Sequence, residues 1–244
     1  MVSDPKSMHA QSECLDMLLD YLPKRHPELY RLEGSGKSLS IIVLSTAEAL
    51  LVSDYQHCPL ELCGRIVQED LVIMRRVDPE DPDKEAGGAA DRHVMTAASV
   101  VFSFGDLEAR LGKPLSFLHA PVPGFEQELN VLVNKALDGI PVERPLWRNN
   151  WDLVSDGQID LPTYEVPLGS SQQVPPTPVP ASERWLKVEY QTFRRLPSSQ
   201  AVLSLCGPSW SHQAMCKYKG LESEQASQWC AFLACPMVSG QEYD

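Results

Sequence analysis

A proline-rich segment late in the chain limits most strongly what this sequence can fold into. Residues 166–182 read VPLGSSQQVPPTPVPAS, with five prolines between Val166 and Pro180. Proline lacks the backbone N–H that helices and inner strands use, so the segment is predicted to be an extended, disordered loop. The ordered fold must therefore be built from what precedes this loop and from the strands that follow it.

The chain before the loop shows helical spacing in two places. In SECLDMLLDYL (Ser12–Leu22) leucines recur three and four residues apart and Pro23 follows, which predicts an amphipathic helix. The same spacing runs through Pro121–Gly139, where a glycine ends the pattern and predicts a second helix.

Short runs of apolar and β-branched residues predict strands on either side of the second helix. The runs are Leu39–Leu44, Ala49–Val52, Leu62–Met74, Val94–Phe104, Leu146–Val154, Trp185–Leu196 and Ala201–Leu205. An acidic, Pro- and Gly-rich loop is expected at residues 78–91, and a helix at residues 222–233 is the one pattern in the tail. Strands joined by short turns favour an α+β fold, an antiparallel sheet flanked by helices, over a doubly wound parallel sheet.

Charge and cysteine content narrow the class of protein. The 244 residues carry 21 basic and 33 acidic side chains, a net charge of −12, which argues against a nucleic acid partner because phosphate contacts need clustered lysine and arginine. No apolar run reaches the roughly 18–20 residues of a membrane-spanning helix, and the start of the chain lacks the apolar core of a signal peptide. We therefore expect a cytoplasmic protein with no membrane partner, whose seven cysteines are mostly reduced thiols.

Most familiar catalytic motifs do not occur. Gly34–Ser38 (GSGKS) looks like the end of a phosphate-binding loop, but Arg31 stands where that motif needs its first glycine, so a tight turn is the favoured interpretation. GxSxG, HExxH and GxGxxG are missing from the sequence. Hydrolase and Rossmann chemistry therefore have no local support.

His119 is the first candidate functional residue. It ends an apolar stretch in LHAPVPGF, directly before a Pro-x-Pro corner, and proline can fix an imidazole relative to a cavity because it locks φ. A lone histidine is more often a core residue, and one histidine does not specify a zinc site. A heme iron, however, needs only one axial protein ligand. On the residues alone, the core histidine and the heme ligand both stay open.

Two polar segments form the second candidate cluster, Arg148–Trp151 (RNNW) and Glu189–Arg195 (EYQTFRR). Strand residues alternate between faces, so Glu189 and Arg194 cannot point the same way. Charged groups are costly to bury without partners. Either this is a surface strand with Glu–Arg pairs across the sheet, or one arginine faces a cavity where it binds a carboxylate, a propionate or the negative charge on bound oxygen.

Five segments give the sequence a resemblance to a known family. They are VQEDLVIM (Val67–Met74), MTAASVVF (Met95–Phe102), GKPLSFLHAPVPGF (Gly112–Phe125), RNNWDL (Arg148–Leu153) and VEYQTFRRLP (Val188–Pro197). In order and approximate spacing the chain resembles the heme-dependent oxidative N-demethylase-like family from about Ser12 to Leu205. The Pro-rich insertion and the acidic composition are more typical of a fungal member than of a bacterial one.

The resemblance implies a fold, a cofactor and partners. Residues 1–205 would form a PAS-like domain that holds heme b, and residues 206–244 a divergent tail. The protein would be a monooxygenase-type oxidoreductase that uses dioxygen to oxidise an amine-bearing small molecule, in secondary metabolism, with release of a methyl group as formaldehyde. Electrons would come indirectly from NAD(P)H through a flavin and iron–sulfur reductase partner.

The resemblance also implies roles for residues. His119 would be the axial iron ligand and thus the metal site. Other cofactor-binding residues would be Arg148, Trp151 and Gln191, and catalytic residues would be Tyr190, Arg194, Arg195 and Glu189.

Two departures from the family pattern keep rival functions open. The family usually reads Glu-Arg-Gln-Thr-Leu-Arg-Arg-Leu-Pro, whereas Tyr190 and Phe193 stand at the second and fifth places; a phenol removes a permanent cation and its donor fork. The chain also starts late and departs from the family after Leu205, as a shortened member would, which leaves either an inactive relative or a sheet edge covered by a partner. The rivals are a catalytically inactive PAS-like module that senses heme or binds a ligand, and a heme-free small-molecule binder.

Overall fold

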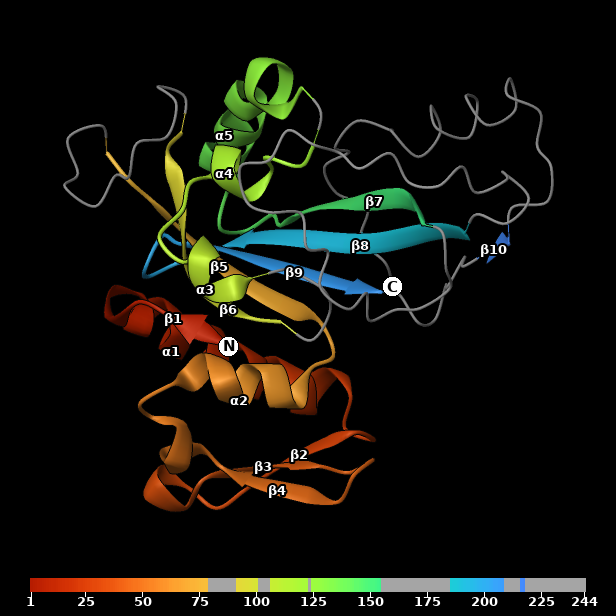
Figure 1. Ribbon diagram of the computed structural model, residues 1–244. Coiled ribbons are helices and arrows are strands. Elements are labelled where there is room, and N and C mark those ends of the chain that lie inside the picture. Colours follow the sequence, from red (N-terminus) through yellow and green to blue (C-terminus); the bar gives the residue numbers. More distant parts are fainter. Residues whose placement is uncertain (79–90, 101–105, 123, 155–184, 209–215, 218–244) are drawn as a thin grey trace.

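The computed structural model describes residues 1–78, 91–100, 106–122, 124–154, 185–208 and 216–217, and for 150–154, 185–188, 208 and 216–217 the backbone alone. These residues form an antiparallel sheet with helices on both faces and a second, smaller sheet (Figure 1). The predicted α+β class with an antiparallel sheet is therefore confirmed.

Seven strands make up the main sheet, and all their pairings are antiparallel. In space the order is β1 (Val2–Ser3), β6 (His93–Ser99), β5 (Asp70–Arg76), β9 (Val202–Pro208), β8 (Trp185–Arg195) and β7 (Leu146–Val154). The short strand β10 (Cys216–Lys217) pairs with the start of β8, on the same edge as β9. Over residues 189–193 strand β8 is hydrogen-bonded to β7 on one side and to β9 on the other.

The smaller sheet is a three-stranded meander of β2 (Tyr30–Glu33), β3 (Ser40–Val43) and β4 (Glu48–Leu51). The GSGKS segment is the connection between β2 and β3, where the 3-10 turn η2 spans Gly36–Ser38. Gly34 has φ +77°, and a Cβ there would lie 2.3 Å from the carbonyl oxygen of Ser38, so only glycine fits. The tight turn predicted here is confirmed.

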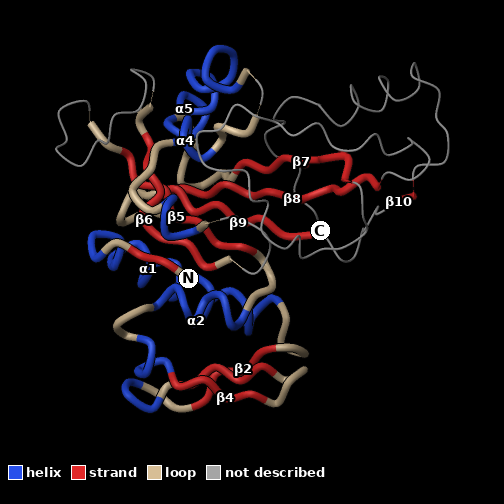
Figure 2. Tube along the Cα trace, viewed as in Figure 1, coloured by secondary structure: helices blue, strands red, loops and turns tan. Residues whose placement is uncertain are grey.

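Helices lie on both sides of the main sheet, as Figure 2 shows. Helices α1 (Met8–Arg25) and α2 (Pro59–Ile66) cover one face, and α3 (Leu107–Arg110), α4 (Leu115–Leu118), the π-helical turn η4 (Phe125–Leu129) and α5 (Asn130–Asp138) cover the other. Single 3-10 turns stand at Pro5–Ser7 (η1) and Val52–Tyr55 (η3). No helix in the described ranges is both long and apolar enough to cross a bilayer.

Strand β5 separates two apolar clusters because its side chains alternate. Leu71 and Ile73 pack with α1 and α2, whereas Val72 and Met74 pack with α4 and α5. We name the two sides of the sheet the α1 face and the α5 face. The two faces belong to separate cores, so a residue's position along a strand decides which core it joins.

The expected strand at Leu62–Met74 is wrong over its first half. Residues 59–66 form α2, and the strand begins at Asp70. Pro59 occupies the first turn of the helix, where proline is favoured, and short apolar runs do not distinguish a buried helix from a strand. Gly64 lies so close to β6 that a Cβ would stand 2.1 Å from the hydroxyl of Ser99. The lack of a side chain at Gly64 thus lets α2 pack closely against β6.

The other element predictions differ in their outcomes. The strands at β3, β4, β7, β8 and β9 are confirmed, and β9 runs past the expected domain boundary to Pro208. The first helix is longer than expected because Pro23 lies inside it, and the second begins with η4 before α5. The Pro-rich loop at residues 166–182, most of the loop at 78–91 and the helix expected at 222–233 lie outside the described residues.

Candidate functional site

The pleat of β8 divides the polar residues predicted as one site. Phe193 packs in the α5-face cluster and Arg195 bonds to α5, so Glu189 and Gln191 share that face. Arg194 lines a recess with residues of α1, so it and Tyr190 share the α1 face. His119 belongs to the α5 side, because its ring stacks on Phe125 of that cluster.

His119 stands at the C-terminal end of α4, half-buried. Its Nδ1 lies 2.9 Å from the carbonyl oxygen of Leu115. A carbonyl only accepts hydrogen bonds, so Nδ1 carries the proton and Nε2 keeps its lone pair. Nε2 makes no hydrogen bond within the part of the chain that the structure describes. The imidazole therefore presents an unprotonated nitrogen.

Burial and nearby positive charges favour the neutral form of the His119 ring. Burial lowers the pKa of His119, the hydrogen bond to Leu115 opposes that shift, and the positive charges of Arg148 and Arg110 lower the pKa further. A neutral imidazole is the form that binds a metal ion. The site thus combines a ligand-competent nitrogen with two nearby guanidinium groups.

Side-chain hydrogen bonds hold both ends of α4, the short helix that His119 caps at its C-terminus. The buried carboxylate of Asp91 accepts hydrogen bonds from the backbone N–H and the hydroxyl of Ser116, which satisfies free donors of the first turn. Arg110 donates to the carbonyl oxygen of Leu118 at 3.1 Å. A helix of four residues is marginal alone, so these contacts fix the position of His119.

Arg148, Gln191, Glu189 and Cys206 form a second group on the α5 face. Arg148 Nε donates to Gln191 Oε1 at 2.8 Å, and its guanidinium lies 5.6 Å from the ring centre of Phe193. Gln191 Nε2 approaches Cys206 Sγ at 3.6 Å, and that thiol donates to Glu189 at 3.7 Å.

The thiol of this group is a hydrogen-bond donor. Burial, together with the negative charge of Glu189, raises the pKa of Cys206 to about 12. Cys206 is therefore a thiol at neutral pH and does not present the thiolate that binds metals. Gln191 and Glu189 instead surround Arg148, and no described residue is a hydrogen-bond acceptor for the terminal nitrogens of its guanidinium, which could therefore bind an anionic group.

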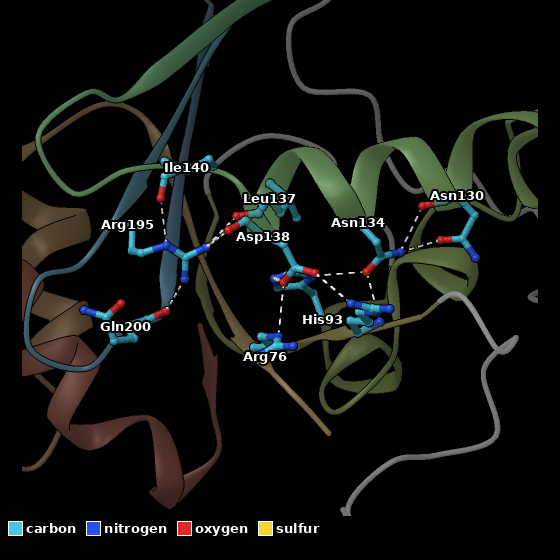
Figure 3. Close-up of polar contacts among 10 residues, drawn as sticks. Arg76, His93, Asn130, Asn134, Leu137, Asp138, Ile140, Arg195 and Gln200 are labelled. Atoms are coloured by element: carbon cyan, nitrogen blue, oxygen red, sulfur yellow. Dashed lines mark hydrogen bonds and ion pairs between the residues drawn. The ribbon is translucent and has the colours of Figure 1, made fainter. Parts of the chain in front are cut away.

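The guanidinium of Arg195, which was predicted to be catalytic, is held by four backbone carbonyls (Figure 3). Nε donates to Ile140 at 2.8 Å, Nη2 to Leu137 at 2.6 Å and Asp138 at 3.2 Å, and Nη1 to Gln200 at 2.9 Å. The carbonyls at the end of a helix lack partners within it. Arg195 thus caps α5 and joins it to the β8–β9 turn.

Beside this cap lies a buried polar network that the sequence reasoning missed (Figure 3). His93 is fully buried, and its Nδ1 donates to Asn134 Oδ1 at 3.1 Å, since that oxygen also accepts from the backbone of Arg92. Its Nε2 lies 3.6 Å from Asp138, which also pairs with Arg76 and Arg92. Two asparagines four apart in an otherwise apolar helix pattern, Asn130 and Asn134, are the sequence signal that could have revealed it.

Two other predicted residues, Arg194 and Tyr190, lie on the sheet face opposite to His119. Arg194 lines an open recess of about 510 Å³ with His9, Ser12, Glu13, Asp16, Met17, Asp20, Tyr21 and Ser198. Tyr190 is 42% exposed and stacks on Trp147 with ring centres 5.4 Å apart. Trp151 is paired with Val188 in the β7–β8 ladder, and its side chain is outside what the structure describes.

The residues at His119 fit a heme in their chemistry. No three His, Cys, Asp or Glu side chains gather to hold a metal ion in the described ranges, but a porphyrin supplies four nitrogens and needs one axial protein ligand. The neutral His119, with Nδ1–H bonded to a carbonyl, has the hydrogen-bonding pattern of metal-binding histidines. Arg148 and Arg110 could pair with carboxylates of such a cofactor.

Fold and site together define an α+β protein in which a ligand-competent imidazole, at the end of a short helix on the α5 face of the antiparallel sheet, lies near two arginines. The family model described as "Haem-dependent oxidative N-demethylase, alpha subunit-like" matches residues 1–205. The chain therefore belongs to this family, as its five segments predicted, and the match begins at residue 1 and not at Ser12. A search of curated proteins gives no match.

Proposed function

We propose that this protein is a heme-dependent oxidoreductase that uses dioxygen to remove a methyl group from an amine-bearing small molecule. The observation that carries the proposal is His119, a neutral imidazole with Nδ1–H bonded to Leu115, within a chain that matches the family over residues 1–205. When bound, the heme would supply oxygen activation and the oxidation itself. Electrons would reach it from NAD(P)H through a flavin and iron–sulfur partner.

We further propose that the core is PAS-like. Strands β5 to β9 lie in the order β6-β5-β9-β8-β7, and the described helices of the α5 face all come from the connection between β6 and β7. This arrangement supports the proposal because the helices of that one connection pack together on one sheet face, with His119 among them. The domain would span residues 1–205, with β9 continuing three residues beyond.

We propose a separate role at the site for each of these residues. His119 would bind the iron through Nε2, and Arg148, supported by Gln191, would bind a propionate or steady negative charge on oxygen. Glu189 would act through its contact with Cys206. Tyr190 and Arg194 lie on the α1 face, so the tyrosine that replaces the family's arginine is placed away from His119.

Reconstitution with hemin tests the cofactor. The protein at equal concentration with hemin should give a Soret band, and His119→Ala should shift it or abolish it by removing the axial nitrogen. His57→Ala, which changes an exposed histidine, is the matched control and should leave the spectrum unchanged. Failure of the unaltered protein to take up hemin would sink the proposal.

Turnover tests the reaction. The heme-loaded protein with a chemical or flavin-based reductant should consume dioxygen and release formaldehyde from methylated amines, and Arg148→Met should slow this while Arg144→Met, an exposed arginine before β7, should not. Heme binding without formaldehyde from any methylated amine would instead support the module that senses heme or binds a ligand. Absence of a Soret band together with amine binding would support the heme-free binder.

A further inference from the structure

The ring of His119 rests on that of Phe125. The ring centres are 4.3 Å apart and the planes differ by 6°, so the two rings are parallel and in contact. Phe125 is 4% exposed and belongs to the α5-face cluster. It comes from η4 and not from α4, so two separate elements meet at this stack.

The chain between the two rings is built to bring them together. The N–H of Val122 donates to the carbonyl of His119 at 2.8 Å, and that of Phe125 donates to Val122 at 3.2 Å. Gly124, between them, has φ +73°, which glycine adopts without strain. Two consecutive tight turns thus fold Phe125 back over the imidazole.

The π-helical turn η4 completes this arrangement. In an α-helix, residues five apart point about 140° away from each other. The wider turn bonds the N–H of Asn130 to the carbonyl of Phe125, so that both can face inward, and both are buried. Single π turns occur often at functional sites. Here the turn lets Phe125 cover His119 while α5 keeps its own buried residues on the sheet.

We propose that Phe125 is a positioning residue that fixes the orientation of the His119 ring and thereby the direction of its Nε2. The torsion that rotates an imidazole about its Cβ–Cγ bond is broad, so the rotamer alone does not set the ring plane. The bond to Leu115 fixes one edge and the stack fixes the plane. This inference rests on the proposed function for its purpose, since it concerns the nitrogen that would bind the iron.

A measurement on the heme-free protein tests the inference directly. Nitrogen-15 NMR of the histidine rings reports which nitrogen carries the proton. In the unaltered protein His119 should be found with the proton on Nδ1. In Phe125→Leu, which keeps an apolar side chain but removes the flat ring, the bond to Leu115 weakens and the ratio of the two tautomers should fall roughly fivefold.

Three further variants separate positioning from general packing. Leu137→Ala removes a buried side chain of the same cluster and should lower stability at least as much, yet leave the His119 tautomer unchanged. Phe125→Tyr or Phe125→Trp restores a flat ring and should restore the tautomer. An unchanged tautomer ratio in Phe125→Leu, or an equal change in Leu137→Ala, would overturn the inference.

The heme-loaded form supplies a second readout. Phe125→Leu should bind hemin with a broadened or shifted Soret band and a mixture of iron spin states, because the axial nitrogen is no longer held in one direction. If the unaltered protein takes up no hemin, the proposed function fails, while the NMR result on the heme-free protein still decides the role of Phe125.

Discussion

The two faces of the main sheet are held to their helices by different means. On the α5 face, directional polar contacts add to an apolar cluster: Arg195 donates to four carbonyls, and the fully buried His93 bonds to Asn134. On the α1 face, α1 and α2 pack through leucine, isoleucine and cysteine side chains. Hydrogen bonds fix direction, whereas apolar burial is non-directional. On the side that carries His119, hydrogen bonds thus fix the direction of α5 in addition to apolar packing.

The adjacent arginines Arg194 and Arg195 give the largest expected contrast between the faces. Arg195→Ala should lower the free energy of unfolding by about 3 kcal/mol, because it leaves several partly buried carbonyls without a donor. Arg194→Ala, on the α1 face, should change it by less than about 1 kcal/mol. Urea unfolding of both variants checks this. Equal losses would show that the faces do not differ in this way.

Close packing on the α1 face is tested at Gly64. Intrinsic propensity alone would make Gly64→Ala stabilising by about 1 kcal/mol in a helix. The added Cβ, however, would meet the hydroxyl of Ser99 at 2.1 Å, and overpacking costs about 1–3 kcal/mol. We expect a net loss of about 1 kcal/mol in thermal or urea unfolding. Adding Ser99→Gly should recover most of it, and a stabilised Gly64→Ala would contradict the packing argument.

The network on the α5 face should respond to pH. Burial lowers the pKa of His93, against the contacts with Asn134 and Asp138 that raise it. The unfolded chain therefore binds a proton more readily, and stability falls as pH drops through and below the ordinary histidine pKa of about 6.5. His93→Gln should flatten the pH dependence of the free energy of unfolding between about pH 7 and 5. His57→Gln, at an exposed site, should leave the slope unchanged.

A smaller effect is expected where α1 meets the β8–β9 turn. Burial tends to raise the pKa of Glu13, but hydrogen bonds from Ser199 and from the backbone of Ser198 outweigh it and lower the pKa. Glu13→Gln should cost less than about 1 kcal/mol at neutral pH. Because the folded pKa is lowered, the difference from the unaltered protein should disappear as pH falls below the ordinary range for glutamate. Asp16→Asn, on the same helix, is the control.

Much of the sheet could be predicted because its strands alternate. The pattern in β8 set both its extent and the division of its side chains between faces, and the structure follows both. Helix α2 was mistaken for a strand because eight residues are too few to show a helical period clearly. The helix α4 has four residues and depends on Asp91 and Arg110 from outside it, so no local pattern could reveal it.

Candidate site residues could be named from the sequence, but their arrangement in space could not. His119 stood out through its prolines, and the structure gives it the neutral form that a ligand needs. The contacts of Arg195 could not be predicted, because its partners are backbone carbonyls, which every residue has. The stack with Phe125 needs a left-handed glycine and a π turn between the two rings, and neither has a recognised sequence signature.

Strand β8 is paired on both edges over residues 189–193, and these two neighbours fix its hydrogen-bond register. Removing one residue there would not merely shorten the strand; it would exchange the two faces for everything beyond the deletion. Arg195, which caps α5, would then face α1. Arg194 would face α5 instead, but from a different position along the strand. A natural variant of this protein should therefore tolerate insertions in the surrounding loops far more readily than in this strand.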